Sequence, residues 1–411
     1  MKKLSVILII FLLAANLYAE EEQLKKPRFR MRDRSFELGL ANVNVGFANN
    51  FVGVKDILKD KITLDFTKLD KDFNLGFDAN VRPFYFNINA KNRWGFGMDF
   101  GNVTVYGNIA LAGNLLKLRP SDKDGDSFGI GASAFVDVGI PVFFKIKNVW
   151  NRDLRINFRP AGFMAAFYAS PSMKYTYRDT DNGTLLEIDY GFKAYAPFSL
   201  EFGKEAFKID VGSALGFDIS IGADYPLFKF LDIGVQFINI PLKSSRLNNY
   251  VKMAGKASLD SSEVTIEDLI NDSDKAMKEL LNLPDNFDIK YGSDEGKRFY
   301  RPFKMLFTAN YRPFVRPVLF ISPAIGFSYN PVFVKKTAIE FGVKVGCELG
   351  NIFTTSFKTC YEDQMWKNGV DFLLNLYVFE LGFGVGMQSQ QFVQSWQGKG
   401  VRANLSIKLG F

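Results

Sequence analysis

Apolar and polar residues alternate along much of the chain, and the alternation is clearest at its C-terminus. In residues 401–411, VRANLSIKLGF, the odd positions are Val, Ala, Leu, Ile, Leu and Phe, while the even positions are Arg, Asn, Ser, Lys and Gly. A period of two residues is typical of a β-strand whose faces contact different media. Residues 207–221 and 380–387 repeat this period. The pattern therefore predicts a chain built mainly of such strands, each of these segments being one strand.

One stretch, residues 261–286, has helical chemistry instead. Thr265 can cap a turn with Asp268 three residues later, and apolar residues then recur at helical spacing until Pro284 ends the pattern. We expect two short helices here, within an insertion that spans Leu242 to Arg301. The chain as a whole holds 43 Phe and 35 Gly, and aromatic residues make up 15% of it, a combination that favours strands.

The apolar faces of so many strands need a cover, and one short helical stretch cannot supply it. Lipid can supply it. The sequence therefore predicts an all-β fold, a single antiparallel transmembrane β-barrel of roughly 14–16 strands. Towards the C-terminus short turns alternate with longer loops, as the two ends of such a barrel require. The same alternation places the insertion 242–301 on the extracellular side.

The N-terminus has the layout of a secretory signal peptide. Two lysines precede an apolar stretch that is too short to span a membrane as a helix, and cleavage is expected after Ala19. Residues 20–35 then form a basic periplasmic tail, and residues 36–411 form the barrel. The net charge of +7 for the whole chain is a mild excess that does not argue for a nucleic-acid partner.

Few residues of the chain are candidates for catalysis or for metal binding. The chain has no histidine, which removes Ser-His-Asp and Cys-His nucleophiles, His-based proton transfer and most zinc sites. Asp122–Asp126 has the carboxylate spacing of a calcium loop, but Ser133 stands where the twelfth-position Glu would be. We expect no enzyme, no metal and no cofactor. Cys347 and Cys360 lie on opposite predicted faces, which predicts two free thiols.

The signal peptide, the alternating aromatic-rich strands and the final Phe together resemble bacterial outer-membrane β-barrel proteins. The resemblance implies contact with outer-membrane lipid, and recognition of the last strand by the barrel-assembly machinery through Leu405, Ile407, Leu409 and Phe411. The sequence Asn-x-Arg-Pro also recurs, at residues 80–83, 157–160 and 310–313. We interpret the recurrence as a strand-end turn, because Pro cannot donate to a β-ladder, with an old duplication as the alternative.

Three functions remain open for such a barrel. The first is a pore that passes small solutes by diffusion. The second is a transporter for hydrophobic molecules, similar in size to the long-chain fatty-acid transport barrels, although the short charged N-terminus differs from their N-terminal hatch. The third is a structural or adhesive surface protein with a plugged lumen. The polar residues predicted to face the lumen are Lys208, Asp210, Asp218, Glu340, Lys344, Glu348, Lys358, Glu380, Arg402 and Lys408.

Overall fold

A computed structural model describes most of the chain. The residues described are 34–50, 53, 73–90, 93–111, 127–170, 172–180, 183–199, 211–228, 230–260, 288–293, 296–313, 319–331, 336–349, 352–376 and 378–410. The predicted signal peptide and most of the basic tail lie outside them, as do the predicted helices of residues 261–286 and the terminal Phe411. Among the described residues, no helix is long and apolar enough to cross a membrane.

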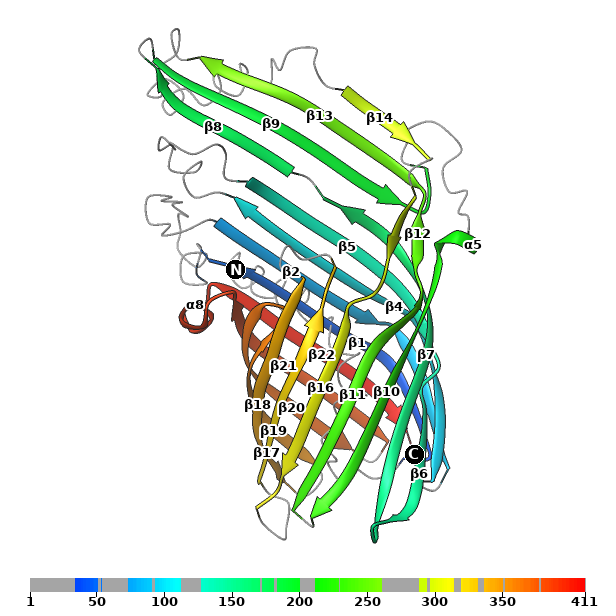
Figure 1. Ribbon diagram of the computed structural model, residues 1–411. Helices are drawn as coiled ribbons and strands as arrows, with labels where there is room; N and C mark the ends of the chain where they lie inside the picture. The colour runs from blue at the N-terminus through cyan, green and yellow to red at the C-terminus, as the bar shows by residue number, and fades with distance from the viewer. Residues whose placement is uncertain are drawn as a thin grey trace, which may run out of the picture.

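Fourteen antiparallel strands form a closed barrel, within the predicted range (Figure 1). The wall closes where the first strand pairs with the last, Glu37 opposite Gly410. Around the wall, the strands are β1 (Phe36–Asn49), β2 (Phe73–Arg82), β4 (Trp94–Leu111), β5 (Ser127–Gly139), β7 (Arg152–Ala169), β10 (Leu215–Phe228), β11 (Leu231–Lys243), β16 (Phe303–Tyr311), β17 (Leu319–Tyr329), β18 (Thr337–Leu349), β19 (Phe353–Glu362), β20 (Met365–Leu376), β21 (Phe379–Ser389) and β22 (Gly400–Gly410).

Three neighbouring strands of this wall are interrupted at one level. Pro83 separates β2 from its continuation β3 (Phe84–Ala90), and Pro141 stands between β5 and its continuation β6 (Val142–Val149). Between them β4 shifts register after Asp99, where Gly101 adopts a φ of 67°. Proline has no N–H for the ladder, and this φ suits glycine. The wall stays paired, because β3 bonds to β1 and β4, and β6 bonds to β4 and β7.

Above the barrel, at the end away from the C-terminus in Figure 1, the wall extends into a second group of strands. This upper sheet consists of β8 (Ser172–Thr180), β9 (Gly183–Ala196), β13 (Asn249–Asp260) and β14 (Asp288–Gly292), and it joins the barrel through β5 and β7. A separate two-stranded ribbon pairs β12 (Ser245–Leu247) with β15 (Lys297–Phe299). The described part of the insertion 242–301 is therefore made of strands.

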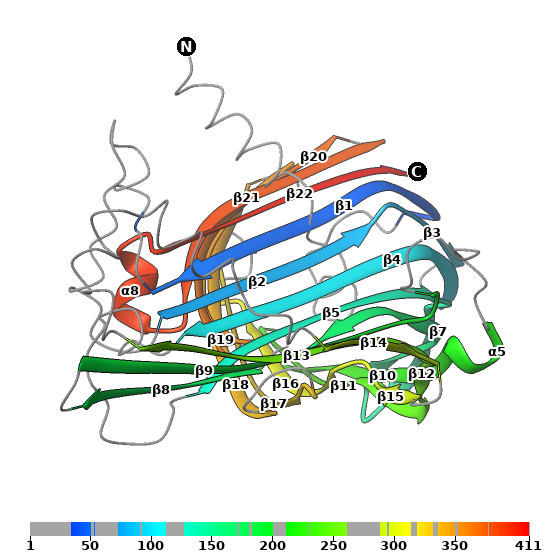
Figure 2. The same cartoon turned by 90° about the horizontal axis from the view of Figure 1, so that it is seen from above.

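One predicted strand is wrong in part. Residues 207–221 do not form one strand, because α5 (Val211–Ala214) is a helical turn that precedes β10. The turn positions Ala214, whose carbonyl accepts a hydrogen bond of 2.5 Å from the Ser245 hydroxyl of the ribbon. A second short helix, α8 (Phe392–Trp396), follows β21 and lies outside the ring of strands (Figure 2). Cys347 and Cys360 are both free, as predicted.

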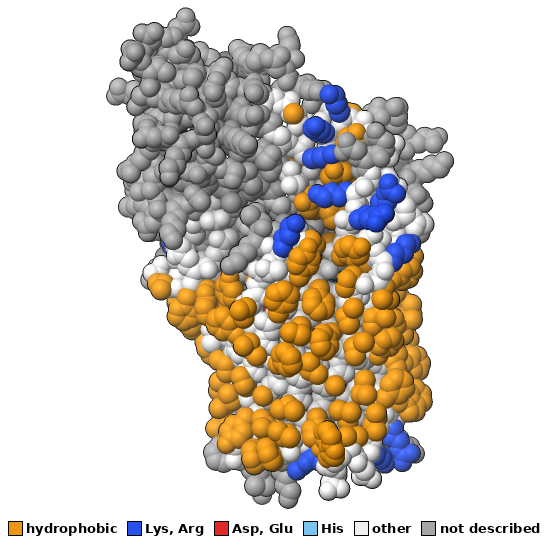
Figure 3. All heavy atoms as spheres, in the orientation of Figure 1, with side chains coloured by type: hydrophobic (Ala, Val, Ile, Leu, Met, Phe, Trp, Pro, Cys, Tyr) orange, Lys and Arg blue, Asp and Glu red, His pale blue; other side chains and the backbone are white. Residues whose placement is uncertain are grey.

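The outer surface of the barrel is apolar. Hydrophobic side chains cover its side as a continuous band, with Lys and Arg side chains above and below that band (Figure 3). Large side chains such as Phe307, Ile325 and Ile339 are 48%, 57% and 65% exposed on this surface. A soluble protein would bury such residues, so the band marks the part of the wall that lipid covers.

Candidate functional site

The inner face of the wall carries the charged residues. Along β22, Arg402 and Lys408 are 8% and 2% exposed, and Lys408 pairs with Glu380 of the neighbouring strand at 2.9 Å. On that neighbouring strand, β21, Phe383 lies three residues after Glu380, so it points to the opposite face, outwards, and it is 43% exposed. Inner and outer residues therefore alternate as they do in a barrel with a polar lumen.

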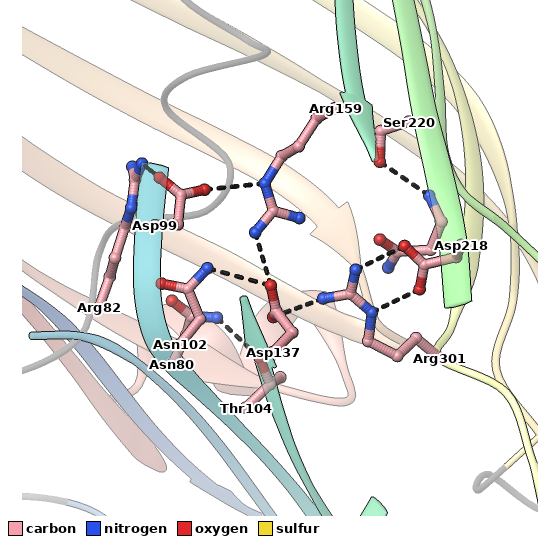
Figure 4. A network of polar contacts seen from close by, with 11 residues as sticks. Asn80, Arg82, Asp99, Asn102, Thr104, Asp137, Arg159, Asp218, Ser220 and Arg301 are labelled. Carbon is pink, nitrogen blue, oxygen red and sulfur yellow. Dashed lines mark hydrogen bonds and ion pairs between the residues drawn. The ribbon is translucent and has the colours of Figure 1, made fainter. Parts of the chain in front are cut away.

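A chain of alternating arginines and aspartates runs along the interrupted side of the lumen (Figure 4). We call it the Arg–Asp seam, and its members in order are Arg82, Asp99, Arg159, Asp137, Arg301 and Asp218. Arg159 reaches Asp99 at 2.8 Å and Asp137 at 2.5 Å. Arg301 reaches Asp137 at 2.5 Å and binds Asp218 with two hydrogen bonds of 2.7 Å. Every member is nearly buried, so each charge depends on its partners.

Each arginine of the seam directly precedes a proline. Arg82 precedes Pro83 at the break between β2 and β3, and Arg301 precedes Pro302 at the start of β16. Arg159 precedes Pro160, whose carbonyl accepts the N–H of Ile140 at 2.9 Å, beside the break in β5. A proline has no N–H to donate to the ladder, and the charged seam links the neighbouring strands at this level.

A second cluster of charges lies on the strands opposite. Lys304 of β16 lies 3.4 Å from both Glu340 and Glu362 and 2.8 Å from Asp363, while Lys367 lies 3.2 Å from Asp363. Asp363 occupies the turn between β19 and β20. Burial alone would raise the pKa of its carboxyl group, but the two ammonium groups outweigh burial and hold the pKa below its usual range. Within the described residues, no group of acidic residues and thiols is arranged to hold a metal ion.

A cavity of about 930 Å³ occupies the lumen beside the seam. Charged side chains of both signs line it, including Arg82, Asp99, Lys304, Glu380 and Lys408. The lining also includes asparagines and serines, whose side chains can form hydrogen bonds, together with apolar side chains such as Phe143, Phe158 and Ile238.

Above the seam the inner face of β5 and β7 becomes apolar. Phe135 lies two residues before Asp137 on the inner face of β5, on its upper side, and Phe163 lies above Arg159 on β7. The ribbon packs against them from the lumen side through Leu247 and Phe299, which are 0% and 5% exposed. We call this group the aromatic cluster, and among the described residues its buried members are Phe135, Phe163, Ala165, Tyr168, Tyr195, Leu247 and Phe299.

The closed ring of strands, its apolar outer band and its charged lumen decide the class of protein. This chain is a transmembrane β-barrel of the outer-membrane type. No protein-family model and no curated protein matches the sequence.

Solved barrels resemble this one at a distance. The toluene transporter TbuX of Ralstonia pickettii is 8% identical over 97% of this chain and 95% of that chain, with a TM-score of 0.47. A FadL homologue of Pseudomonas aeruginosa is 10% identical over 92% of this chain and 91% of that chain, with a TM-score of 0.46. The monoaromatic hydrocarbon channel CymD is 7% identical over 97% and 94%, with a TM-score of 0.48. At these TM-scores the likeness carries no argument about this chain.

The structure places eight of the ten predicted lumen residues, and Lys208 and Asp210 lie outside the described residues. Asp218 belongs to the Arg–Asp seam and Glu340 to the Lys304 cluster. Four others form ion pairs with nearby residues: Lys344 with Asp371 at 3.7 Å, Lys358 with Glu362 at 3.5 Å, and Glu380 with Lys408 at 2.9 Å. The remaining two, Glu348 and Arg402, are buried, with exposed fractions of 5% and 8%.

Sequence reasoning missed the arginines of the seam. Two of them, Arg82 and Arg159, belong to the recurring Asn-x-Arg-Pro sequence, which we interpreted as a turn. The third copy fits that interpretation, because Arg312 follows the end of β16, where its N–H donates to the Phe230 carbonyl at 2.7 Å. The signal for the seam is an arginine directly before a proline, at a break inside the wall.

Proposed function

We propose that this barrel passes small hydrophobic molecules across the outer membrane. The aromatic cluster above the seam carries the proposal, because it lines the lumen side of the wall at the predicted extracellular end. A diffusion pore is polar throughout its lumen, whereas an apolar compartment favours a ligand that leaves water easily. The same class of cargo is named for TbuX and CymD, a likeness too distant to carry the proposal.

The ribbon links the aromatic cluster to the seam. Lys297, Phe299 and Arg301 are alternate residues of one segment. The Lys297 ammonium lies 4.0 Å from the centre of the Tyr168 ring, Phe299 packs inside the cluster, and Arg301 enters the seam. We expect a molecule that enters the aromatic cluster to displace this segment, and so to loosen the seam around Asp137 and Asp218.

Diffusion of small polar solutes is the second candidate. It is supported by the cavity beside the seam, whose lining carries both signs of charge and many amide groups. Such a lining suits water and small hydrophilic solutes without selecting strongly for either ion sign.

Uptake by intact cells separates the two candidates. Cells that produce the barrel are given a radiolabelled monoaromatic hydrocarbon, and purified barrel in liposomes is tested for swelling in small sugars. We expect hydrocarbon uptake, and Phe163→Ala should lower it about tenfold, or ~1.4 kcal/mol. Phe327→Ala is the matched control, because Phe327 is 37% exposed on the lipid face. Swelling without hydrocarbon uptake would support the polar pore instead, and neither activity would favour a surface-binding role.

A further inference from the structure

The short helix α8 folds against the outside of the barrel. The loop from β21 to β22 turns back over β19 and β20, and α8 lies beside the wall in both views (Figures 1 and 2). Trp396 of α8 stacks on Phe357 of β19 with ring centres 5.8 Å apart. Phe392 meets the Trp366 ring of β20 edge-on at 4.7 Å. The contacts are therefore with the outer face of the wall.

Beneath α8 lies a polar residue on the lipid-facing side. Lys367 points into the lumen, so Asn368 points outwards, between the outward residues Trp366 and Val370. An amide facing hydrocarbon without partners costs several kcal/mol. Asn368 is only 4% exposed, because α8 covers it.

Both the nitrogen and the oxygen of the covered amide are hydrogen-bonded. Its Nδ2 donates to the Ser395 hydroxyl at 2.7 Å, and its Oδ1 accepts from the Thr359 hydroxyl at 2.6 Å. Ser395, which is 0% exposed, donates in turn to the Phe392 carbonyl at 2.5 Å. The hydrogen bond from Asn368 to Ser395 therefore holds this side of α8 against the wall.

The apolar side chains of α8 remain partly exposed beside these contacts. Phe392, Val393 and Trp396 are 46%, 64% and 48% exposed. They continue an aromatic patch that the wall provides at this end, in which Phe341 and Tyr361 lie 5.3 Å and 5.4 Å from the Trp366 ring. This patch is continuous with the apolar band of the barrel, for which lipid is already the cover.

We propose that α8 is an interfacial anchor, inserted at the boundary between the head groups and acyl chains of the leaflet at this end, the predicted outer leaflet. Tryptophan concentrates at that depth because its ring is apolar and its N–H is polar, and girdles of aromatic residues flank the apolar band of outer-membrane barrels. The Asn368 network holds the helix to the wall, and the exposed side chains of α8 enter the lipid. The anchor sets the height of this loop on the membrane, a role separate from transport.

Fluorescence of Trp396 tests the anchor. The variant W94F/W150F/W366F leaves Trp396 as the single tryptophan, and the protein is placed in phosphatidylcholine vesicles that carry bromine near the head groups or near the chain ends. We expect shallow bromine to quench the emission several-fold more than aqueous acrylamide does. The matched control carries one tryptophan in the lumen, T308W with all four native tryptophans changed to Phe, because Thr308 lines the cavity. The emission of this control should be quenched by acrylamide and not by the brominated lipids.

Two outcomes overturn the proposal. One is quenching of Trp396 by acrylamide to the level of the T308W control, with no effect of bromine. The other is loss of bromine quenching when a hydrophobic cargo is added, which would make the patch a cargo platform. If the tryptophan variant does not fold, a nitroxide on V393C in a C347S/C360S background reports the same depth through its accessibility to oxygen and to a water-soluble nickel complex. A water-exposed nitroxide would also reject the anchor.

Discussion

Arg301 is the residue on which the seam depends most, since it satisfies two aspartates that belong to different strands. Arg301→Gln shortens the side chain and removes the charge, which takes the bound cation from buried Asp218, while Asp137 keeps its contact with Arg159. We expect the free energy of unfolding to fall by about 3–5 kcal/mol, measured by urea titration in lipid vesicles. Arg298→Gln is the control, because Arg298 lies on the same ribbon and is exposed. Equal stability of the two variants would show that the seam contributes nothing.

A glycine beside the seam tests how tightly its arginines are held. A Cβ added at Gly139 would collide with the Arg159 guanidinium, whereas a Cβ at Gly107 would meet no atom closer than 3.8 Å. Arg159 cannot retreat without leaving Asp99 or Asp137. Gly139→Ala should therefore lower the urea midpoint, with a loss of about 1–3 kcal/mol, while Gly107→Ala leaves the midpoint close to that of the native chain. A neutral Gly139→Ala would mean that Arg159 has room to move.

Among elements, the upper sheet carries an unfavourable alignment of charge. Lys252 of β13 stands directly opposite Lys193 of β9 and Lys290 of β14. Like charges in register across a sheet repel. Lys252→Glu converts both pairs into attractive ones, and each pair should gain about 0.2–1 kcal/mol. Slower hydrogen exchange of the β13 amides would report the gain, with Lys336→Glu, outside the upper sheet, as the control. Unchanged exchange would show that the repulsion is already relieved.

Elements differ in how far the sequence predicted them. The wall strands were predictable because one face of each contacts lipid and the other contacts the lumen. Apolar and polar residues therefore alternate with a period of two in nearly every strand. The helical turn α5 was not predictable, because the four residues Val211–Ala214 are too few to show a helical period. In addition, the alternation of apolar and polar residues continues on both sides of the turn. The sequence predicts that Pro83 and Pro141 weaken the β-ladder where they occur. It does not predict that the two breaks lie at the same level of the wall.

The partners of charged residues were not predictable for a related reason. Parity assigns a residue to a face, but register decides which residues on that face meet. Lys408 and Glu380 meet because β21 and β22 pair in one register, and a shift of two residues would keep both in the lumen while separating them. The role of Arg301 depended further on the path of the insertion, which no local pattern encodes.

At the scale of the whole molecule, the lumen combines charged and apolar regions. The aromatic cluster lies above the Arg–Asp seam on β5 and β7, the charged cavity lies beside the seam, and α8 marks the upper end on the outside. Each region combines several strands that are distant in sequence, so the lumen is a property of the complete ring.

The pairing of Glu37 with Gly410 joins the two ends of the barrel sequence. Neighbouring strands along the chain can pair as soon as both are present, but this last pair closes a loop of nearly the full chain length, the slowest kind of contact to form. Until β22 arrives, β1 and β21 are open edges that invite pairing with other chains. A chain shortened by even one strand is therefore a candidate for proteolysis or aggregation, and the same adjacency makes the barrel suited to circular permutation, with new termini cut in any wall loop.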